Sequence, residues 1–341
     1  MPAALQIPEI TYLPCDPTDR KTKIGLIGCG SITRDHLTAY RSAGYNVVAL
    51  CDLQLQAAQR RSDEFFPDAD VYDDPRKLLN RDDIAVVDIA THPEVRAQII
   101  EDALKAGKHV LSQKPFVLDL DVGQRLIKVA DQQGRKLAVN QNGRWAPHFS
   151  YIRNAIDQGV IGQVQSVQMA VHWDHNWIAG TEFDNVKHVI LYDFAIHWFD
   201  ILCCFMGNRQ PKSVFASSTR SKTQAARPAL MGQAMVQYED AQASLVFNGD
   251  TRCGAFDTTV VVGTHGTISS IGPDLSSQQV TLAINDQRIC PELAGRWFPD
   301  GFHGTMGELL RAIEEDRQPD HAAENNLQSL SLCFAAVASA E

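Results

Sequence analysis

The sequence predicts an α/β protein in which a parallel sheet with helices on both faces precedes a region built around a mostly antiparallel sheet. From residue 23 to about 142, short apolar runs alternate with segments whose apolar residues recur at helical spacing, as in strand–helix units with buried strands. After about residue 144, longer alternating strands follow one another without helices between them, which favours antiparallel pairing. The length of 341 residues fits about two domains.

The first half contains five apolar runs that are expected to form the parallel sheet. They span residues 23–28, 47–52, 85–91, 109–115 and 136–142. Between them, residues 31–44, 55–66, 93–108 and 120–135 have the apolar spacing of helices. Residues 1–22 contain four prolines and are expected to form an extended arm before the first strand.

The second half is expected to start with a helix over residues 147–159. Strands are expected over 164–174, 212–220, 234–240, 241–250, 257–270 and 279–285, with a hairpin turn at residues 238–241. Two helices, Met306–Glu315 and Ala323–Ala338, are expected at the end of the chain.

Composition and charge narrow the range of partners and locations. Lys plus Arg number 31 and Asp plus Glu 41, a net charge of −10, and an acidic chain without a basic block is not expected to bind nucleic acid or an anionic membrane. No apolar run approaches about 20 residues, and the start does not resemble a signal peptide. The 8 cysteines are scattered without a CxxC pair, which indicates free thiols in a reducing cytosol. We therefore expect a cytoplasmic protein without disulfides.

A glycine-rich turn is the first chemical signal. Gly28 and Gly30 follow the first strand, and Ser31 and Ile32 lead into a helix, an arrangement that lets backbone N–H groups face a pyrophosphate. Thr33 stands where GxGxxG has its third glycine. Asp52 ends the next strand, suits ribose hydroxyls and would repel a 2′-phosphate. The turn predicts a dinucleotide site that prefers NAD to NADP; the alternative is a glycine turn in an unrelated parallel α/β protein.

Lys114 is the second signal. It lies in the run Ser112–Pro115, at the carboxyl end of a predicted strand, where open α/β sheets bind ligands. A lysine at this edge can contact a substrate hydroxyl or the nicotinamide ribose, although a surface lysine at a strand end is the simpler interpretation.

The third signal is a helical segment, 191–200, in which Asp193, His197 and Asp200 are expected to share one face. An Asp one turn before a His can orient the imidazole and raise its basicity, whereas a solvent-facing ion pair or a buried structural histidine would need no function. Upstream, the run 172–177 is rich in His and Trp, and aromatic faces beside polar groups suit sugars. Because no tight spacing such as HExxH occurs, we expect no metal site.

Together these motifs resemble the glucose-fructose oxidoreductase / inositol dehydrogenase / rhizopine-catabolism protein family. The resemblance runs from about Lys23 to Ala338 and includes GLIGCGSI, IATHP, ALKAGKHVLSQKP, NGRWAP, DFAIHWFD and GFHGTMGELLRAI. It implies an N-terminal Rossmann domain followed by a C-terminal α+β domain with a large open, mostly antiparallel sheet. It also implies reversible hydride transfer between a carbinol of a sugar or cyclitol and a nicotinamide, and oligomerisation through the open sheet, as a homodimer or homotetramer.

The resemblance also assigns roles to residues. The lysine of the family's EKP motif matches Lys114, and the aspartate and histidine of its DxGxH motif match Asp193 and His197. These three are the expected catalytic residues. The expected cofactor-binding residues are Gly28, Gly30, Ser31, Ile32, Asp52, Thr91, His92, Pro93, Gln113, Lys114 and Asn142, and the expected substrate-binding residues are Arg144, Trp145, His175, Trp177 and Trp297.

The chain departs from the family pattern at several positions. Gln113 replaces the Glu of EKP, Ala195 replaces the glycine of DxGxH, and Arg96 stands where a His is common. Residues 188–190 replace a glycine run that usually precedes DxGxH. Because these changes surround the expected catalytic residues without altering them, they leave the substrate open.

The leading hypothesis is an NAD-dependent oxidoreductase that acts on a secondary hydroxyl of a sugar, sugar derivative or cyclitol. The alternatives are an NAD-dependent glycoside-cleaving enzyme that oxidises its substrate transiently, and a non-catalytic NAD-binding regulator. The expected division is an arm over 1–22, an NAD-binding domain over 23–143, and a substrate-binding and oligomerisation domain over 144–341, whose last helices could also pack on the first domain.

Overall fold

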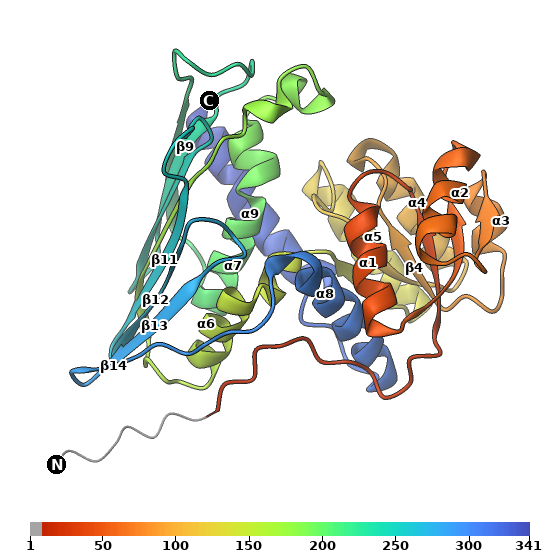
Figure 1. The fold of residues 1–341 in the computed structure, drawn as a ribbon, viewed down its shortest axis with the longest axis horizontal. Coiled ribbons are helices and arrows are strands. Elements are labelled where there is room, and N and C mark those ends of the chain that lie inside the picture. The colour runs from red at the N-terminus through yellow and green to blue at the C-terminus, as the bar shows by residue number, and fades with distance from the viewer. Residues whose placement is uncertain (1–8) are drawn as a thin grey trace. The chain divides into compact units, whose positions relative to one another are not determined.

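The computed structural model describes residues 9–341, which form two compact units. The parallel-sheet unit contains residues 14–145 and 298–328. The eight-stranded unit contains residues 146–297 and 329–341 together with residues 9–13 of the arm. Each unit is therefore assembled from segments that lie far apart in the sequence (Figure 1).

The parallel-sheet unit is a Rossmann-type sheet of six parallel strands in the order β3-β2-β1-β4-β5-β6. The strands are β1 (Lys23–Ile27), β2 (Asn46–Cys51), β3 (Asp70–Tyr72), β4 (Val86–Ile89), β5 (His109–Ser112) and β6 (Leu137–Val139). Its helices are α1 (Thr33–Ala43), α2 (Leu55–Phe65), α3 (Pro75–Leu79), α4 (Pro93–Lys105), α5 (Leu120–Gln133) and α8 (Trp297–Glu314), which is kinked at Phe298.

The predicted parallel sheet is confirmed, but β3 and α3 were not anticipated. β3 has only three residues, none of them buried, so it lacks the apolar run that marks the other strands. α3 begins where the side chain of Asp74 accepts a hydrogen bond from the backbone N–H of Arg76, with Pro75 in the first turn. Short elements of this kind are fixed by capping rather than by periodicity.

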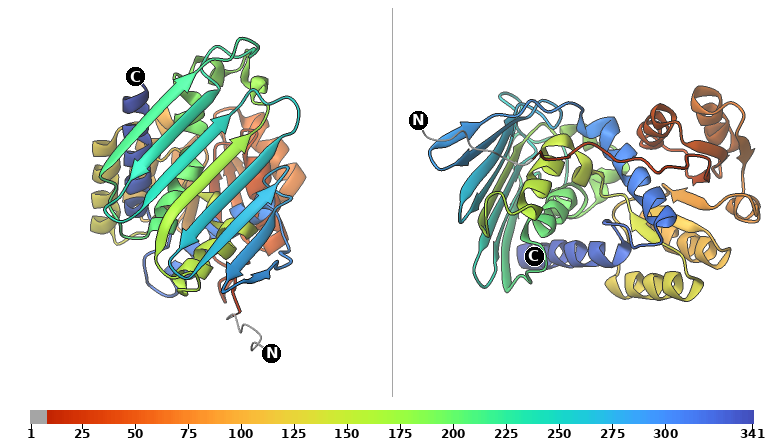
Figure 2. Two further views of the ribbon diagram at one scale, coloured as in Figure 1. Left: turned by 90° about the vertical axis from the view of Figure 1, so that its left-hand side faces the viewer. Right: turned by 90° about the horizontal axis from the view of Figure 1, so that it is seen from below.

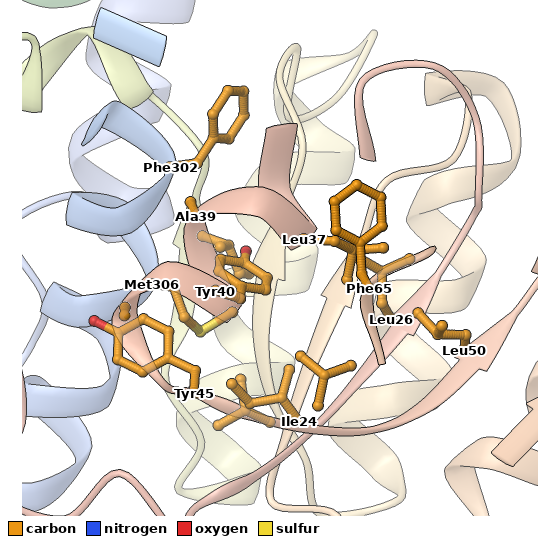
Figure 3. Packing of buried hydrophobic residues seen from close by; sticks show 14 of the residues in the cluster. Ile24, Leu26, Leu37, Ala39, Tyr40, Tyr45, Leu50, Phe65, Phe302 and Met306 are labelled. Atoms are coloured by element: carbon orange, nitrogen blue, oxygen red, sulfur yellow. The ribbon is translucent and has the colours of Figure 1, made fainter. Parts of the chain in front are cut away.

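The core of this unit joins α1, α8 and the sheet (Figure 3). Leu37 and Tyr40 of α1 are fully buried, as are Phe302 and Met306 of α8. Burial of aromatic and aliphatic side chains on this scale is the main source of stability. The C-terminal helix α8 is thus an integral part of the Rossmann unit, which the chain reaches by returning after the second sheet.

The described part of the arm, residues 9–22, contains neither a helix nor a strand. Its residues 16 and 18 bind side chains of the parallel-sheet unit. The carboxylate of Asp16 accepts hydrogen bonds from the Tyr45 hydroxyl at 2.6 Å and lies 2.6 Å from Nε2 of His303. Further along, the backbone N–H of Thr18 donates to Glu314 at 2.9 Å. The rest of the predicted arm, residues 1–8, lies outside the described residues.

The eight-stranded unit is a mostly antiparallel sheet in the order β14-β13-β12-β11-β7-β10-β9-β8, with only β7 and β10 parallel among its neighbours. The strands are β7 (Val164–His172), β8 (Ser213–Thr219), β9 (Met231–Gln237), β10 (Gln242–Asn248), β11 (Phe256–Gly263), β12 (Gly266–Gly272), β13 (Gln279–Ile284) and β14 (Gln287–Ile289). Helices α6 (Pro147–Asp157), α7 (Ile196–Met206) and α9 (Ala323–Ala340) accompany it.

The prediction of one strand over residues 257–270 is wrong, because the chain reverses there between β11 and β12. Gly263 permits the reversal: a Cβ atom on it would lie 2.1 Å from the carbonyl oxygen of Ile161. The predicted turn at 238–241 is confirmed by a backbone hydrogen bond of 2.9 Å from Tyr238 N–H to the Ala241 carbonyl.

The two faces of this sheet differ. Helices lie behind one face, and no helix within residues 9–341 crosses the other (Figure 2, left). The strand register places five exposed apolar side chains together on the open face. They are Phe215, Met235, Val246, Phe256 and Ile271, which are between 37% and 58% exposed.

Candidate active site

The glycine turn after β1 has the geometry of a dinucleotide cradle. Gly28 has φ of 94°, and a Cβ atom there would lie 2.8 Å from the carbonyl carbon of Ala90, so only glycine fits. A Cβ atom on Gly30 would meet no atom within 4 Å. The open side of Gly30 and the first turn of α1 leave room for a pyrophosphate at a helix N-terminus.

Thr33 and Asp52 complete this turn. Thr33, which replaces the third glycine, is buried, and its hydroxyl donates to the Gly30 carbonyl at 2.7 Å. Asp52 accepts 2.8 Å hydrogen bonds from the backbone N–H groups of Cys29 and Gln54. A carboxylate oxygen has more than one lone pair, so Asp52 braces the turn and still suits a ribose hydroxyl. These residues fit NAD.

Lys114 follows β5 in a turn held by its neighbour. The peptide bond between Lys114 and Pro115 is cis. The side-chain oxygen of Gln113 accepts a hydrogen bond of 2.7 Å from the backbone N–H of Lys114. The Gln113 side chain is buried, so it supports this turn from within the protein.

Arg96 of α4 joins the turn at Lys114 to the loop after β4. Its guanidinium donates to the carbonyls of Gln113, at 2.6 Å, and Pro115, and to the carbonyl of Thr91, at 3.0 Å from Nε. Arg96 is only 2% exposed. The sequence identified Arg96 only as a departure from the family pattern, because the carbonyls of Gln113 and Pro115 belong to a different segment of the chain.

The loop after β4 starts helix α4. Thr91 lies beside Gly28 in the fold, since its backbone nitrogen is 3.0 Å from the position a Gly28 Cβ would take. His92 is the N-cap residue of α4 and Pro93 its first helical residue. The glycine turn, this loop and the turn at Lys114 therefore lie at the carboxyl ends of β1, β4 and β5, at one edge of the sheet.

The segment after β6 is more deeply buried than the sequence suggested. Asn142, Arg144 and Trp145 belong to the 3₁₀ helix η1 (Asn142–Trp145) and are all buried. The Arg144 guanidinium donates to the Asp320 carbonyl at 2.6 Å, and the Trp145 ring packs edge-on against His321. These contacts support packing roles within the parallel-sheet unit.

Gln141, which the sequence did not single out, has an unusual environment. It is 1% exposed, and neither polar atom of its side-chain amide has a hydrogen-bond partner among the described residues. Buried amides are nearly always bonded to protein, water or ligand. Gln141 follows β6, at the same edge of the sheet as the glycine turn, and is a candidate ligand contact.

In the eight-stranded unit, Asp193 and His197 lie where one type of helix changes to another. Asp193 belongs to a π-helical turn, η4 (Ile190–Phe194), and His197 to the first turn of α7. Both are partly exposed. Asp200, which was expected to share their face, is 1% exposed and accepts a hydrogen bond of 3.0 Å from the Ser329 hydroxyl of α9. Asp200 therefore has a structural partner within the eight-stranded unit.

Aromatic side chains surround this turn. The Trp297 ring is buried and packs edge-on against His197, with centroids 5.6 Å apart. The His175 ring packs against Phe194 at 3.8 Å, and the Trp177 indole N–H donates to Nδ1 of His175 at 2.9 Å. Trp177 itself is 61% exposed. The structure thus brings Trp297 to His197, and His175 and Trp177 to the turn that carries Asp193.

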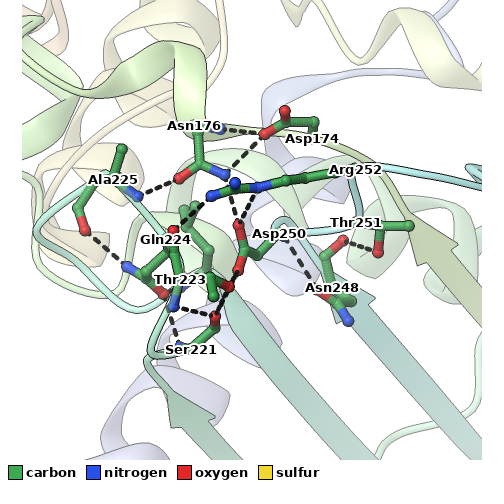
Figure 4. Close-up of polar contacts among 12 residues, drawn as sticks. Asp174, Asn176, Ser221, Thr223, Gln224, Ala225, Asn248, Asp250, Thr251 and Arg252 are labelled. Atoms are coloured by element: carbon green, nitrogen blue, oxygen red, sulfur yellow. Dashed lines mark hydrogen bonds and ion pairs between the residues drawn. The ribbon is translucent and has the colours of Figure 1, made fainter.

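A polar network holds the loop that carries His175 and Trp177 (Figure 4). Asp250 accepts hydrogen bonds from the hydroxyls of Ser221 and Thr223, at 2.5 and 2.6 Å, and from the Asn176 amide at 2.7 Å. The hydroxyl donors, Ser221 first, lower the pKa of Asp250 to about 2. Asn176 also binds Asp174 at 2.8 Å. The sequence offered no signal for Asp250, because its hydrogen-bond donors come from two loops distant in sequence, one with Asn176 and the other with Ser221 and Thr223.

Within residues 9–341, no group of three or more His, Cys, Asp and Glu side chains is arranged to hold a metal ion. The helices of that same part of the chain include none that is long and apolar enough to cross a membrane.

Comparison with known proteins identifies the family. A family model described as "Oxidoreductase family, NAD-binding Rossmann fold" matches residues 22–141, and one described as "GFO/IDH/MocA C-terminal domain" matches residues 149–269. Together they cover more than half of the chain. The chain belongs to the GFO/IDH/MocA oxidoreductase family. Its parallel-sheet unit is the NAD-binding Rossmann domain of that family.

Related GFO/IDH/MocA proteins include dehydrogenases of sugars and cyclitols. A D-apiose dehydrogenase of Paraburkholderia graminis is 30% identical over 56% of this chain and 51% of its own length. An inositol 2-dehydrogenase of Rhizobium meliloti is 25% identical over 93% of this chain and 96% of its own. The chain spans about half the length of the first curated relatives it matches.

Solved structures share the fold. An oxidoreductase from Agrobacterium radiobacter, in complex with NAD+, L-tartaric acid and magnesium, has a TM-score of 0.82 at 20% identity and covers 94% of this chain and 96% of its own. A scyllo-inositol dehydrogenase from Lactobacillus casei, with bound NAD(H) and scyllo-inositol, has a TM-score of 0.79 at 22% identity, with coverage of 94% and 96%.

Proposed function

We propose that this protein is an NAD-dependent dehydrogenase that acts on a secondary hydroxyl of a sugar, sugar derivative or cyclitol. The observation that carries the proposal is the turn at Lys114, which Arg96 and Gln113 hold at the same sheet edge as the glycine cradle. Buried side chains that fix the backbone around one lysine are expected where that lysine must be directed at a reacting group. The sugar and cyclitol dehydrogenases among the relatives support this substrate class.

The chain's own residues would manage the proton and the charge of the reacting hydroxyl. Bound NAD supplies a hydride acceptor. His197 accepts the hydroxyl proton, and Lys114 donates a hydrogen bond to the same oxygen and stabilises the charge that develops on it. Asp193 orients His197 and binds a neighbouring hydroxyl. Gly28, Gly30, Ser31 and Ile32 hold the pyrophosphate.

Among the proposed substrate-binding residues, His175 and Trp177 have the clearest means of contacting a sugar. Their aromatic rings adjoin the turn carrying Asp193, and the Trp177 face is exposed, so the C–H face of a sugar ring can stack there. Trp297 supports the His197 imidazole edge-on and is proposed to act through that residue.

The proposed dehydrogenase differs from a glycoside-cleaving enzyme in whether NADH accumulates during turnover, because transient oxidation returns the hydride to the substrate. The purified protein should be incubated with NAD and a panel of sugars, cyclitols and glycosides while absorbance at 340 nm and products are followed. Accumulation of NADH in proportion to a carbonyl product supports the dehydrogenase. Release of an aglycone without NADH would indicate transient oxidation, and NAD binding without turnover on any member would favour a regulator.

We also propose that the open sheet face pairs with a second copy of the chain. Phe215, Met235 and Ile271 form an apolar stripe across it, together with Val246 and Phe256, and clustered apolar side chains on a flat surface favour association. Light scattering at micromolar concentration should give a dimer or tetramer mass. Replacing Met235 and Ile271 by Glu should lower that mass. A wild-type monomer would contradict the proposal, and exposed Leu53→Glu, in the other unit, is the matched control.

A further inference from the structure

A network of buried, hydrogen-bonded polar side chains adjoins the turn at Lys114. His36 and Tyr40 come from α1, Asp88 from β4, Gln113 from the end of β5 and Asn140 from the end of β6. Nδ1 of His36 and the Tyr40 hydroxyl each lie 2.7 Å from Oδ2 of Asp88. On its other side, Nε2 of His36 lies 3.1 Å from Nε2 of Gln113 and 3.2 Å from Nδ2 of Asn140.

The orientation of Gln113 fixes the protonation of His36. The oxygen of the Gln113 amide accepts from the backbone N–H of Lys114, so the amide nitrogen faces His36. An amide nitrogen only donates. Nε2 of His36 must therefore offer a lone pair, and the ring proton lies on Nδ1, where it is donated to Asp88.

Asp88 is the carboxylate within hydrogen-bond distance of the His36 ring, and Asp35 is a second carboxylate close enough to interact with the ring electrostatically. On α1, burial and the neighbouring Asp88 hold the pKa of Tyr40 well above its usual value, so Tyr40 donates as a neutral phenol; the next residue along α1, Asp35, is partly exposed. From α8, the ring of Phe302 packs at 4.5 Å. Gln113 and Asn140 are neutral amides. Asp88 is thus the carboxylate against which the His36 ring is oriented.

We propose that Gln113 and His36 are positioning residues for Lys114. Asp88 orients the neutral His36 ring, the ring accepts from the Gln113 amide, and the same amide holds the Lys114 backbone. Glutamine suits this position because it presents a donor to His36 and an acceptor to Lys114. A glutamate at 113 would set a carboxylate oxygen against the Nε2 lone pair unless His36 took a second proton. The proposal rests on the proposed role of Lys114.

Two variants separate the parts of this arrangement. Gln113→Glu retains an oxygen for the Lys114 N–H but requires a protonated His36. We expect its kcat to approach that of the wild type at low pH and to fall by about tenfold as the pH rises and that proton is lost, a step absent from the wild-type profile. Gln113→Met removes both contacts, and its kcat should fall by about tenfold at every pH, without the added step. Parallel profiles for Gln113→Glu and wild type would overturn the proposal.

Two measurements without substrate keep the test independent of the proposed function. In ¹⁵N-histidine-labelled protein at pH 7.5, His36 should show the neutral Nδ1–H tautomer in the wild type and the doubly protonated ring in Gln113→Glu. Exchange of the Lys114 amide hydrogen should accelerate by at least about tenfold in Gln113→Met. A wild-type Nε2–H tautomer, or unchanged exchange, would overturn the proposal even if turnover is found. If these results are as expected but Lys114→Ala leaves turnover intact, the role assigned to Lys114 is wrong and the structural linkage stands.

Discussion

The candidate residues of the parallel-sheet unit are fixed by buried hydrogen bonds to backbone groups, whereas those of the eight-stranded unit lie on partly exposed turns supported by aromatic rings. Arg96 and Gln113 bind the backbone around Lys114 from inside the protein. His175 and Trp177, in contrast, lie on a loop that is itself partly exposed and is held by a partly buried polar network. Buried bonds to backbone tolerate little change, since any loss leaves unpaired groups. Surface loops tolerate more.

This difference between the two units matches the different demands of cofactor binding and substrate binding. The cofactor is the same molecule in every NAD enzyme, so a rigid cradle serves it. A substrate class as varied as sugars and cyclitols is better served by loops that can change without disturbing the core. Substrate identity is therefore expected to depend on the loop 173–186 and the turn before α7. The following substitutions test that division.

The largest effects are expected from the proposed catalytic residues, one in each unit. Lys114→Ala and His197→Ala should each lower kcat by about 10²–10⁴-fold, the usual contribution of a positioned acid–base group. His197→Ala should leave NAD affinity nearly unchanged, whereas Lys114→Ala is also expected to weaken NAD binding. Steady-state kinetics and NAD titration measure both. Near-wild-type turnover in His197→Ala on the true substrate would refute its role.

Arg96→Lys tests the rigidity of the cofactor side. Lysine keeps the charge but cannot reach three carbonyls with a planar fork. We expect kcat to fall by about 10–100-fold and the melting temperature to decrease by several degrees, since buried carbonyls lose their donors. Arg125→Lys, at an exposed ion pair with Glu101, is the control and should change neither. An unaltered melting temperature for Arg96→Lys would mean that the clamp contributes little.

Asp250→Asn tests the adaptability of the substrate side. The amide keeps one acceptor but loses the charge that strengthens the bonds from Ser221, Thr223 and Asn176. We expect KM for the sugar to rise about 3–10-fold with kcat nearly constant. The contribution of the ionised Asp250 to stability is present above its unfolded pKa of 3.8 and is lost as the pH falls through about 2, so the network is intact at neutral pH. A loss confined to kcat would contradict this assignment.

An effect of similar size is expected for cofactor preference. Asp52→Ser should weaken NAD binding and reduce the preference for NAD over NADP by about tenfold. Because Asp52 also accepts from the Cys29 backbone N–H, Asp52→Asn is the cleaner variant: it keeps an acceptor for the turn and removes the charge that repels a 2′-phosphate. Fluorescence titration of both cofactors measures the ratio. Tighter binding of NADP than NAD by the wild type would refute the expected preference.

Much of the fold could be predicted from the sequence, because its strong signals are local. Buried strands such as β1 and β4 are continuous apolar runs, and the glycine turn requires Gly28 because its φ of 94° is one that other residues rarely adopt. The two-part organisation followed from the change in periodicity near residue 144. The hairpin between β11 and β12 was missed because the backbone of Ile161, distant in sequence, lies against Gly263, and the short β3 was missed because it has no buried residue.

The sequence by itself determined the class of fold, the glycine cradle and the identity of the residues with the right chemistry for hydride transfer. Only the tertiary structure decided what holds them. It showed that Arg96 binds the backbone around Lys114, that Asp200 is buried and accepts a hydrogen bond from Ser329, and that Gln113 joins His36 to the Lys114 backbone. Each of these outcomes depends on hydrogen bonds between segments distant in sequence, and a buried polar group must find its partner wherever the packed chain provides one.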